Sequence, residues 1–64
     1  MDGKVVRILL IQRGLQLKAL SRLTGIDYDR LQKVINGYRA PRPEELTAIA
    51  TVLGVPLSEI HEEI

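Results

Sequence analysis

The side chains able to do acid–base or nucleophilic chemistry are few in this 64-residue chain, and their spacing does not assemble a catalytic set. The only histidine, His61, lies in an acidic tail with Glu62 and Glu63, so neither Ser21 nor Ser58 is expected to have an activating base. Carboxylates at such an exposed end usually only interact with water. Glycine-rich phosphate loops are also missing. We therefore expect no enzymatic activity.

Signals for a metal, a membrane or secretion are missing from the sequence too. A single histidine without any cysteine cannot supply a closed tetrahedral metal site, so we expect neither metal nor cofactor. The longest apolar stretch, residues 5–11, is interrupted by Arg7 and falls far short of the ~20 residues that span a bilayer. No secretory signal follows Met1. The expectation is a cytoplasmic protein with no membrane partner and no small-molecule substrate.

The charged side chains are distributed unevenly, although the net charge of the chain is only +1. Residues 1–42 contain all nine lysines and arginines and three aspartates, a net charge of +6. Residues 43–64 contain five glutamates and no cation, a net charge of −5. This asymmetry indicates a basic working face and an acidic rear, although a solvated charge pattern with no partner would look similar.

Short helices must position these charges, because glycine, asparagine and proline interrupt the apolar pattern at close intervals. Helices are expected over residues 4–13, 16–24, 27–36 and 43–53, with a last turn or two that carries Ile60 on its inner face. Asp27 fits an N-cap and Pro43 fits the first turn of a helix. No alternating strand pattern competes. We predict one all-α domain over residues 1–64, which in the absence of disulfides needs close helix packing or a partner subunit.

The second and third expected helices, joined at Gly25, carry the most specific pattern. Leu20 and Thr24 can pack against Leu31 and Val34, and Gly25 allows a positive φ in the turn. With this pattern the chain resembles the lambda-repressor-like (XRE-type) helix-turn-helix family of phage repressors and Cro proteins. The resemblance extends in register through Gly14-Leu15, Leu20-Ser21, Gly25-Ile26, Asn36-Gly37, Pro41, Pro43, Leu46, Ala50 and Leu53-Gly54-Val55. It implies a compact five-helix domain whose second and third helices form the helix-turn-helix.

The resemblance also implies that residues 27–36 form a recognition helix that lies in the major groove of DNA. Its expected base-reading residues are those left outside the core: Tyr28, Asp29, Gln32 and Lys33. Gln32 can pair with adenine, Lys33 can donate to guanine or a phosphate, and Tyr28 can contact a thymine methyl or a phosphate. The expected phosphate-binding residues, which include main-chain N–H groups near the end of this helix, are Lys18, Asn36, Gly37, Arg39 and Arg42. An ordinary solvated helix face is the alternative.

Two polar departures from the family pattern affect the expected DNA contact. The family commonly begins its first motif helix with Ser or Thr followed by Gln, whereas this chain has Gln16 and Leu17, so one backbone contact is expected to be missing. Asp27 and Asp29 place negative charge where phosphate would approach. Asp27 fits the role of a helix cap. Asp29 either stabilises the helix N-terminus or accepts a hydrogen bond from cytosine.

Two apolar departures concern the core. Many relatives pair an arginine of the first helix with a glutamate of the third at the positions that Leu10 and Ile35 occupy here, so a hydrophobic contact is expected in place of that ion pair. The first helix also has more apolar side chains than one buried face requires, and Leu17 and Leu23 add to them. This surplus either fills a core that lacks Phe and Trp or marks a surface for a protein partner.

Together these features predict sequence-specific binding of double-stranded DNA by a repressor-like transcriptional regulator. A unit of this size reads only one half-site, and we therefore expect a homodimer on DNA. The resemblance implies that the dimer contact consists of Leu57, Ile60 and Ile64. The alternative is a protein-binding module on the same fold, such as an antirepressor, an antitoxin-like partner or a scaffold domain, which would use the apolar first helix. Low net charge and Asp29 favour this alternative, and the cations at backbone-facing family positions oppose it.

Overall fold

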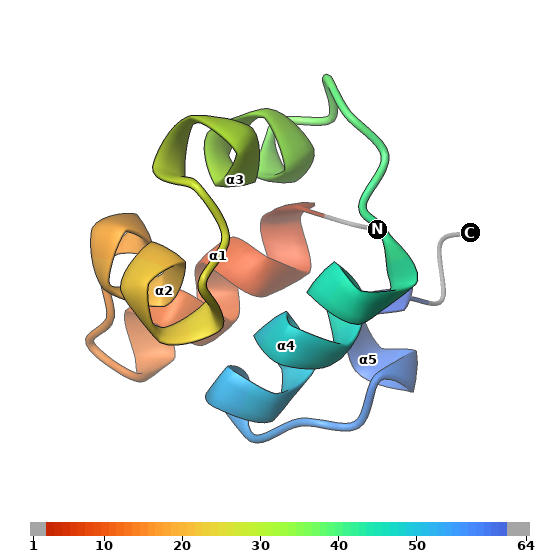
Figure 1. Ribbon diagram of the computed structural model, residues 1–64. Coiled ribbons are helices and arrows are strands. Elements are labelled where there is room, and N and C mark those ends of the chain that lie inside the picture. Colours follow the sequence, from red (N-terminus) through yellow and green to blue (C-terminus); the bar gives the residue numbers. More distant parts are fainter. Residues whose placement is uncertain (1–2, 62–64) are drawn as a thin grey trace.

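Five helices follow one another in the part of the chain that the computed structural model describes, residues 3–61 (Figure 1). They are α1 (Gly3–Gln12), α2 (Leu17–Thr24), α3 (Tyr28–Ile35), α4 (Pro43–Leu53) and α5 (Ser58–His61). The described residues contain no strand, so the predicted all-α fold is confirmed. The first four helices agree with the predicted segments to within one residue at each end.

Local side-chain chemistry explains where the helices begin and end. Asp27 caps α3, because its carboxylate accepts a hydrogen bond from the main-chain N–H of Arg30 at 3.3 Å. Pro43 occupies the first turn of α4, where its missing N–H costs no helical hydrogen bond. Both predicted helix starts are therefore confirmed. They matter for function because α3 is the expected recognition helix and α4 supports it.

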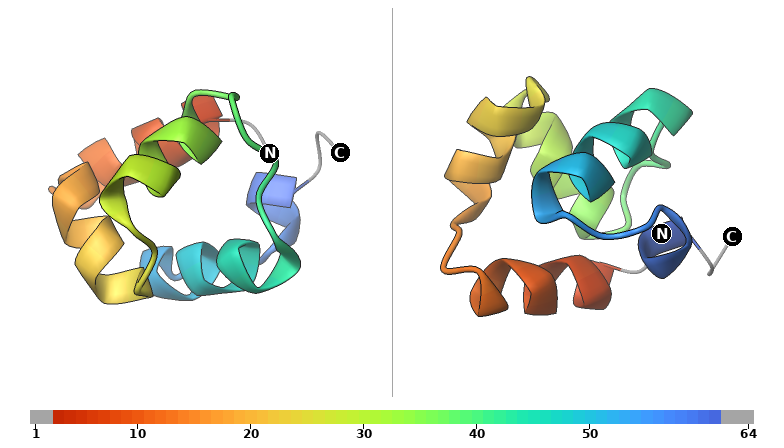
Figure 2. Two further views of the ribbon diagram at one scale, coloured as in Figure 1. Left: turned by 45° about the horizontal axis from the view of Figure 1, so that its top comes forward. Right: turned by 90° about the horizontal axis from the view of Figure 1, so that it is seen from below.

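One hydrophobic core lies between the helices, and every helix contributes at least one side chain that is almost fully buried. These side chains are Val6, Leu20, Leu31, Ile49, Leu53 and Ile60. Each contributes roughly 1.5–3 kcal/mol of burial free energy relative to an exposed position. In Figure 2, α1 runs along one side of the molecule, with α2 at its C-terminal end and α5 near its N-terminal end. The core thus joins α1, α4 and α5 to the pair α2 and α3.

Arg7 of α1 and Arg13, which follows α1, form hydrogen bonds at the ends of two other helices. The Arg13 guanidinium donates a hydrogen bond to the carbonyl oxygen of Leu53, at the end of α4, with an Nε–O distance of 2.6 Å. Arg7 donates to the side-chain oxygen of Asn36, at the end of α3. Cations are favourable there because the last carbonyls of a helix lack intrahelical partners and carry partial negative charge. A Cβ at Gly3 would collide with the carbonyl of Ile35, so α1 starts at close approach to α3.

The apolar surplus of α1 divides between the core and the surface. Val6, Leu9 and Leu10 are buried in the core. Ile8 and Ile11 lie on the outer face of α1, with exposed fractions of 54% and 78%. Part of the apolar surplus of α1 therefore lies on the surface and does not contribute to the core.

Candidate nucleic-acid interface

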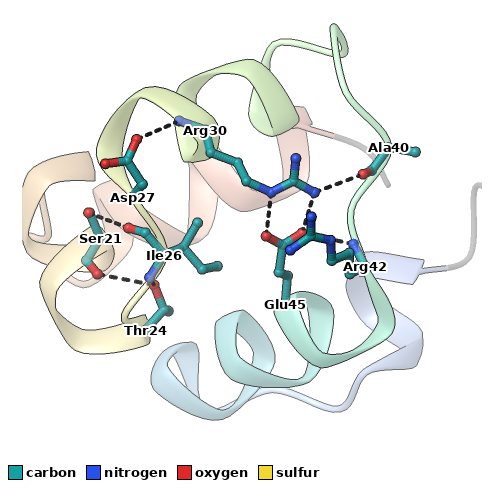
Figure 3. Close-up of polar contacts among 8 residues, drawn as sticks. All are labelled: Ser21, Thr24, Ile26, Asp27, Arg30, Ala40, Arg42 and Glu45. Atoms are coloured by element: carbon teal, nitrogen blue, oxygen red, sulfur yellow. Dashed lines mark hydrogen bonds and ion pairs between the residues drawn. The ribbon is translucent and has the colours of Figure 1, made fainter.

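The turn between α2 and α3 is held by side-chain hydrogen bonds as well as by backbone geometry (Figure 3). Gly25 adopts a left-handed conformation with φ +76°, which a residue with a side chain rarely takes. The Ser21 hydroxyl donates to the carbonyl oxygen of Ile26 at 2.5 Å, and the Thr24 hydroxyl donates to the carbonyl oxygen of Leu20 at 2.7 Å. The main-chain N–H of Ile26 in turn donates to the Thr24 hydroxyl at 3.3 Å. The angle between the two helices is therefore fixed locally.

α3 presents one apolar and one polar face, as the sequence predicts. Leu31, Val34 and Ile35 are buried. Among the predicted base-reading residues, Asp29 and Lys33 are exposed, and Tyr28 and Gln32 are half-buried. The polar face of α3 is thus open to a ligand over both of its turns.

An open groove of about 580 Å³ runs along the polar face of α3 and continues onto the loop that follows. It brings together three of the predicted base-reading residues and two of the predicted phosphate-binding residues. Its lining consists of Asp29, Gln32, Lys33, Asn36, Tyr38 and Arg39. Tyr38 was not among the interface residues predicted from the sequence. Its position between Asn36-Gly37 and Arg39, which were predicted to bind phosphate, is the signal that could have identified it. Its side chain is 78% exposed.

Two of the other predicted contacts lie next to this groove. The Lys18 ammonium, near the start of α2, lies 5.9 Å from the centre of the Tyr28 ring, within range of a cation–π interaction. The Gln32 amide donates a hydrogen bond to the Tyr28 hydroxyl at 3.1 Å, one helical turn away. Tyr28 therefore links the first turn of α2 to the middle of α3.

Arg42 lies apart from the groove. It is exposed at the start of α4 and lines a separate shallow depression with Gly25, Asp27 and Glu44. Arg39 thus lines the groove, and Arg42 lies near the helix-turn-helix turn; Asp27 and Arg30 border both arginines.

The main-chain N–H groups expected to bind phosphate near Asn36 and Gly37 are already used within the protein. The N–H of Asn36 donates to the carbonyl of Gln32 at 2.9 Å, and that of Gly37 donates to the carbonyl of Val34 at 3.2 Å. The main-chain N–H groups of Tyr38 and Arg39 both donate to the carbonyl of Lys33. They close the C-terminus of α3, whose last carbonyls would otherwise lack partners. The predicted contact of these N–H groups with phosphate stays a prediction, and in this structure they have partners within the protein.

A bidentate ion pair joins the inner side of α3 to α4 (Figure 3). Arg30 donates from Nε to one oxygen of Glu45 at 2.6 Å and from its terminal nitrogen to the other at 2.9 Å. Glu45 also accepts the main-chain N–H of Arg42 at 2.8 Å. The hydrogen bonds from Arg30 lower the pKa of Glu45 below its usual range against the opposing effect of burial, and the one from the Arg42 main-chain N–H acts in the same direction. The same pair raises the pKa of Arg30.

Comparison with known families decides what this arrangement is. The family model described as helix-turn-helix matches residues 6–60, which is most of the chain. The chain belongs to the lambda-repressor-like helix-turn-helix family. No curated protein and no solved structure matches the chain. The helix-turn-helix family consists of DNA-binding transcription regulators and typically does not include enzymes. The match therefore indicates that the general function of the chain is that of a DNA-binding transcription regulator.

Two further findings concern ligands and membranes. Within residues 3–61 no helix has the length and apolar character needed to cross a bilayer. In the same range no three His, Cys, Asp or Glu side chains gather as a metal site would require.

The helix-turn-helix family pattern is altered at α1 and α3 in the way the sequence predicts. Leu10 and Ile35, with exposed fractions of 6% and 4%, belong to the same hydrophobic core. A polar link between the two helices is nevertheless present close by, because Arg7 donates to Asn36. Relative to the ion pair of many relatives, the polar contact has moved from the core to the surface. An arginine at the surface avoids most of the desolvation cost that burial imposes on a charged group.

The start of α2 also differs from the helix-turn-helix family pattern. Gln16 is the N-cap of α2, and its side chain forms no capping hydrogen bond. The N–H groups of the first turn of α2 therefore lack the side-chain partner that a Ser or Thr cap provides.

The residues expected at a dimer contact do not form one surface. Ile60 is fully buried in the core of the single chain, so the expectation that it contacts a second copy is wrong. It is buried because α5 is a single turn that covers the open end of the core between α1 and α4. Leu57 is 41% exposed and lies beside an apolar groove with Tyr38, Pro41 and Leu46. Ile64 lies outside the described residues.

Proposed function

We propose that this protein binds double-stranded DNA in a sequence-specific manner and acts as a repressor-like transcriptional regulator, with α3 in the major groove. The observation that carries the proposal is the groove beside α3. It collects Asp29, Gln32 and Lys33 on the face opposite the core, next to Arg39. These side chains offer both hydrogen-bond donors and acceptors, which reading the edges of base pairs requires.

Cations around α3 support contact with the phosphate backbone. Lys18 lies in the first turn of α2, where the N-cap side chain leaves the N–H groups open. Such a helix start attracts an anion through its N–H groups and its dipole. Arg39 and Arg42 are both exposed, one lining the groove beside α3 and one near the turn before it. Asn36 takes part through its side chain, which Arg7 also contacts. This placement suits contact with phosphates beside the groove that α3 would enter.

The test is selection from a random duplex pool at two salt concentrations. The wild-type protein is expected to enrich one short sequence, and binding is expected to weaken as salt rises because phosphate contacts release counterions. Lys33→Ala is expected to relax the preference at one base position and to cost about tenfold in affinity for the enriched sequence. If the wild type enriches no sequence and Lys33→Ala leaves the affinity for DNA unchanged, the proposal fails.

A homodimer on DNA extends the proposal. Leu57 borders the apolar groove that Tyr38, Pro41 and Leu46 line, so a two-fold axis beside it would place Leu57 of each copy against the groove of the other. The wild type is then expected to bind a duplex with two selected half-sites, about 34 Å apart, at least about tenfold more tightly than a duplex with one. Leu57→Glu should lose this gain while keeping its affinity for one half-site.

The control for the dimer is Ile11→Glu, which places the same charge at another exposed apolar position, on α1. It is expected to keep the gain from a second half-site. Equal behaviour of the two variants, or a wild type that shows no gain, contradicts a dimer through Leu57.

A protein-binding module on the same fold is the second candidate function. It is favoured by the outer face of α1, where Ile8 and Ile11 are 54% and 78% exposed. Exposed apolar side chains at neighbouring positions of one helix are common where proteins associate. A failed duplex selection would leave this candidate as the function to pursue.

A further inference from the structure

Two polar side chains on the exposed edge of α3 are bonded to each other. The Gln32 amide donates to the Tyr28 hydroxyl at 3.1 Å, and both side chains are half-buried. The Tyr28 ring is in turn close to the Lys18 ammonium, 5.9 Å from its centre. Tyr28 is therefore contacted at its ring by α2 and at its hydroxyl by α3. The bond to the hydroxyl makes Tyr28 a support for the Gln32 amide.

The bond to Tyr28 determines which groups of the Gln32 amide remain available. The amide has two N–H donors and one carbonyl acceptor. One N–H is used by Tyr28, so one donor and the acceptor are left. Adenine presents the complementary pair in the major groove, an acceptor at N7 and a donor at N6. Guanine presents two acceptors there and would require two donors from the amide.

The opposite orientation of the amide would read the other purine. If the Tyr28 hydroxyl donated to the Gln32 carbonyl, both amide N–H groups would be free and would suit guanine. On DNA the hydroxyl proton of Tyr28 has other acceptors, because phosphate oxygens only accept hydrogen bonds. When its proton is used in this way, the hydroxyl can only accept from Gln32. The direction of the bond in the structure is thus the one that DNA favours.

We infer that Tyr28 is a positioning residue that orients the Gln32 amide to read adenine, and that the Tyr28–Gln32 bond discriminates adenine from guanine. The inference rests on the proposed DNA binding and names the base class that one residue of the interface selects. Tyr28 here acts through Gln32, so its loss changes the choice of base more than the overall affinity.

The experiment compares duplex selection for the wild type, Tyr28→Phe, Gln32→Ala and the control Thr51→Val. The wild type is expected to prefer adenine over guanine by about tenfold at the Gln32 position. Tyr28→Phe should reduce this preference to less than about threefold, and Gln32→Ala should abolish it. Thr51→Val removes a hydroxyl from an exposed position of α4, where it donates to the carbonyl of Thr47 and not to Gln32, and should keep the preference.

A spectroscopic readout tests the bond in the free protein. The side-chain amide protons of Gln32 are expected to give two well-separated NMR signals, one of them protected from exchange, and these should move together in Tyr28→Phe but not in Thr51→Val. A wild type that enriches no sequence defeats the proposed function and this inference together. An adenine preference that survives in Tyr28→Phe, or Gln32 signals that do not respond to Tyr28→Phe, overturns only this inference.

Discussion

Glu45→Ala is expected to lower the free energy of unfolding by about 2 kcal/mol, and the melting temperature by roughly 10 °C. Glu45 is only 7% exposed and makes three hydrogen bonds, two from the Arg30 guanidinium and one from the main-chain N–H of Arg42. Its removal leaves these donors without their charged acceptor. The Arg30 side chain is 28% exposed, so water can reach the guanidinium and limits the loss. In a domain this small, such a loss is a large part of the total stability.

Glu44→Ala is the matched control for this prediction. Glu44 lies in the same first turn of α4, so it has the same relation to the helix dipole, but its side chain is exposed. Its replacement is expected to change stability by less than about 0.5 kcal/mol. Urea unfolding followed by circular dichroism measures both variants. Equal losses would mean that the charge of the first turn, and not the pair with Arg30, stabilises the fold.

The same pair makes stability depend on pH in the acid range. The pKa of Glu45 in the folded protein is lowered, chiefly by its hydrogen bonds from Arg30. Its contribution is therefore fully present above the ordinary pKa of a glutamate, about 4.3, and is lost as the pH falls through the lowered value. The difference in stability between the wild type and Glu45→Gln should be constant near neutral pH and shrink below about pH 4. A difference that persists unchanged to pH 2 would contradict the lowered pKa.

Features set by neighbouring residues were predictable from the sequence. The cap at Asp27, the proline at Pro43 and the glycine turn at Gly25 act over three or four residues, and all three are found where the sequence places them. The spacing of Leu31, Val34 and Ile35 also determines which face of α3 is buried. The remaining residues of α3 then form its polar face. For these reasons the predicted fold is confirmed almost to the residue.

Contacts between distant segments were not predictable in the same way. Arg30 and Glu45 are separated by 15 positions, and Arg13 reaches a carbonyl 40 positions away. No local pattern distinguishes such arginines from ordinary surface charges, because the contact depends on how the helices pack. Ile60 shows the same limit. In a helix of four residues, periodicity cannot separate a side chain that covers its own core from one that contacts a second copy.

The second large effect concerns the phosphate backbone. Simultaneous replacement of Arg39 and Arg42 by alanine is expected to weaken binding to the selected duplex about a hundredfold at low salt, if each arginine neutralises one phosphate. Both side chains are exposed, one in the groove beside α3 and one near the turn before it. The slope of log affinity against log salt should become shallower by about two. Binding titrations over a range of salt concentrations measure this slope.

The charge-matched control separates phosphate contact from a general effect of net charge. Arg22→Ala combined with Arg13→Ala removes two cations as well, but Arg22 lies in the last turn of α2 and Arg13 is bonded to the end of α4. That variant is expected to keep most of the salt slope, with its folding checked by circular dichroism because Arg13 has a structural contact. The base preference of the selected sequence should be the same in both double variants, because phosphate contacts carry no sequence information. If both double variants lose the same slope, the positive half of the chain acts only through its summed field, and Arg39 and Arg42 are not phosphate contacts.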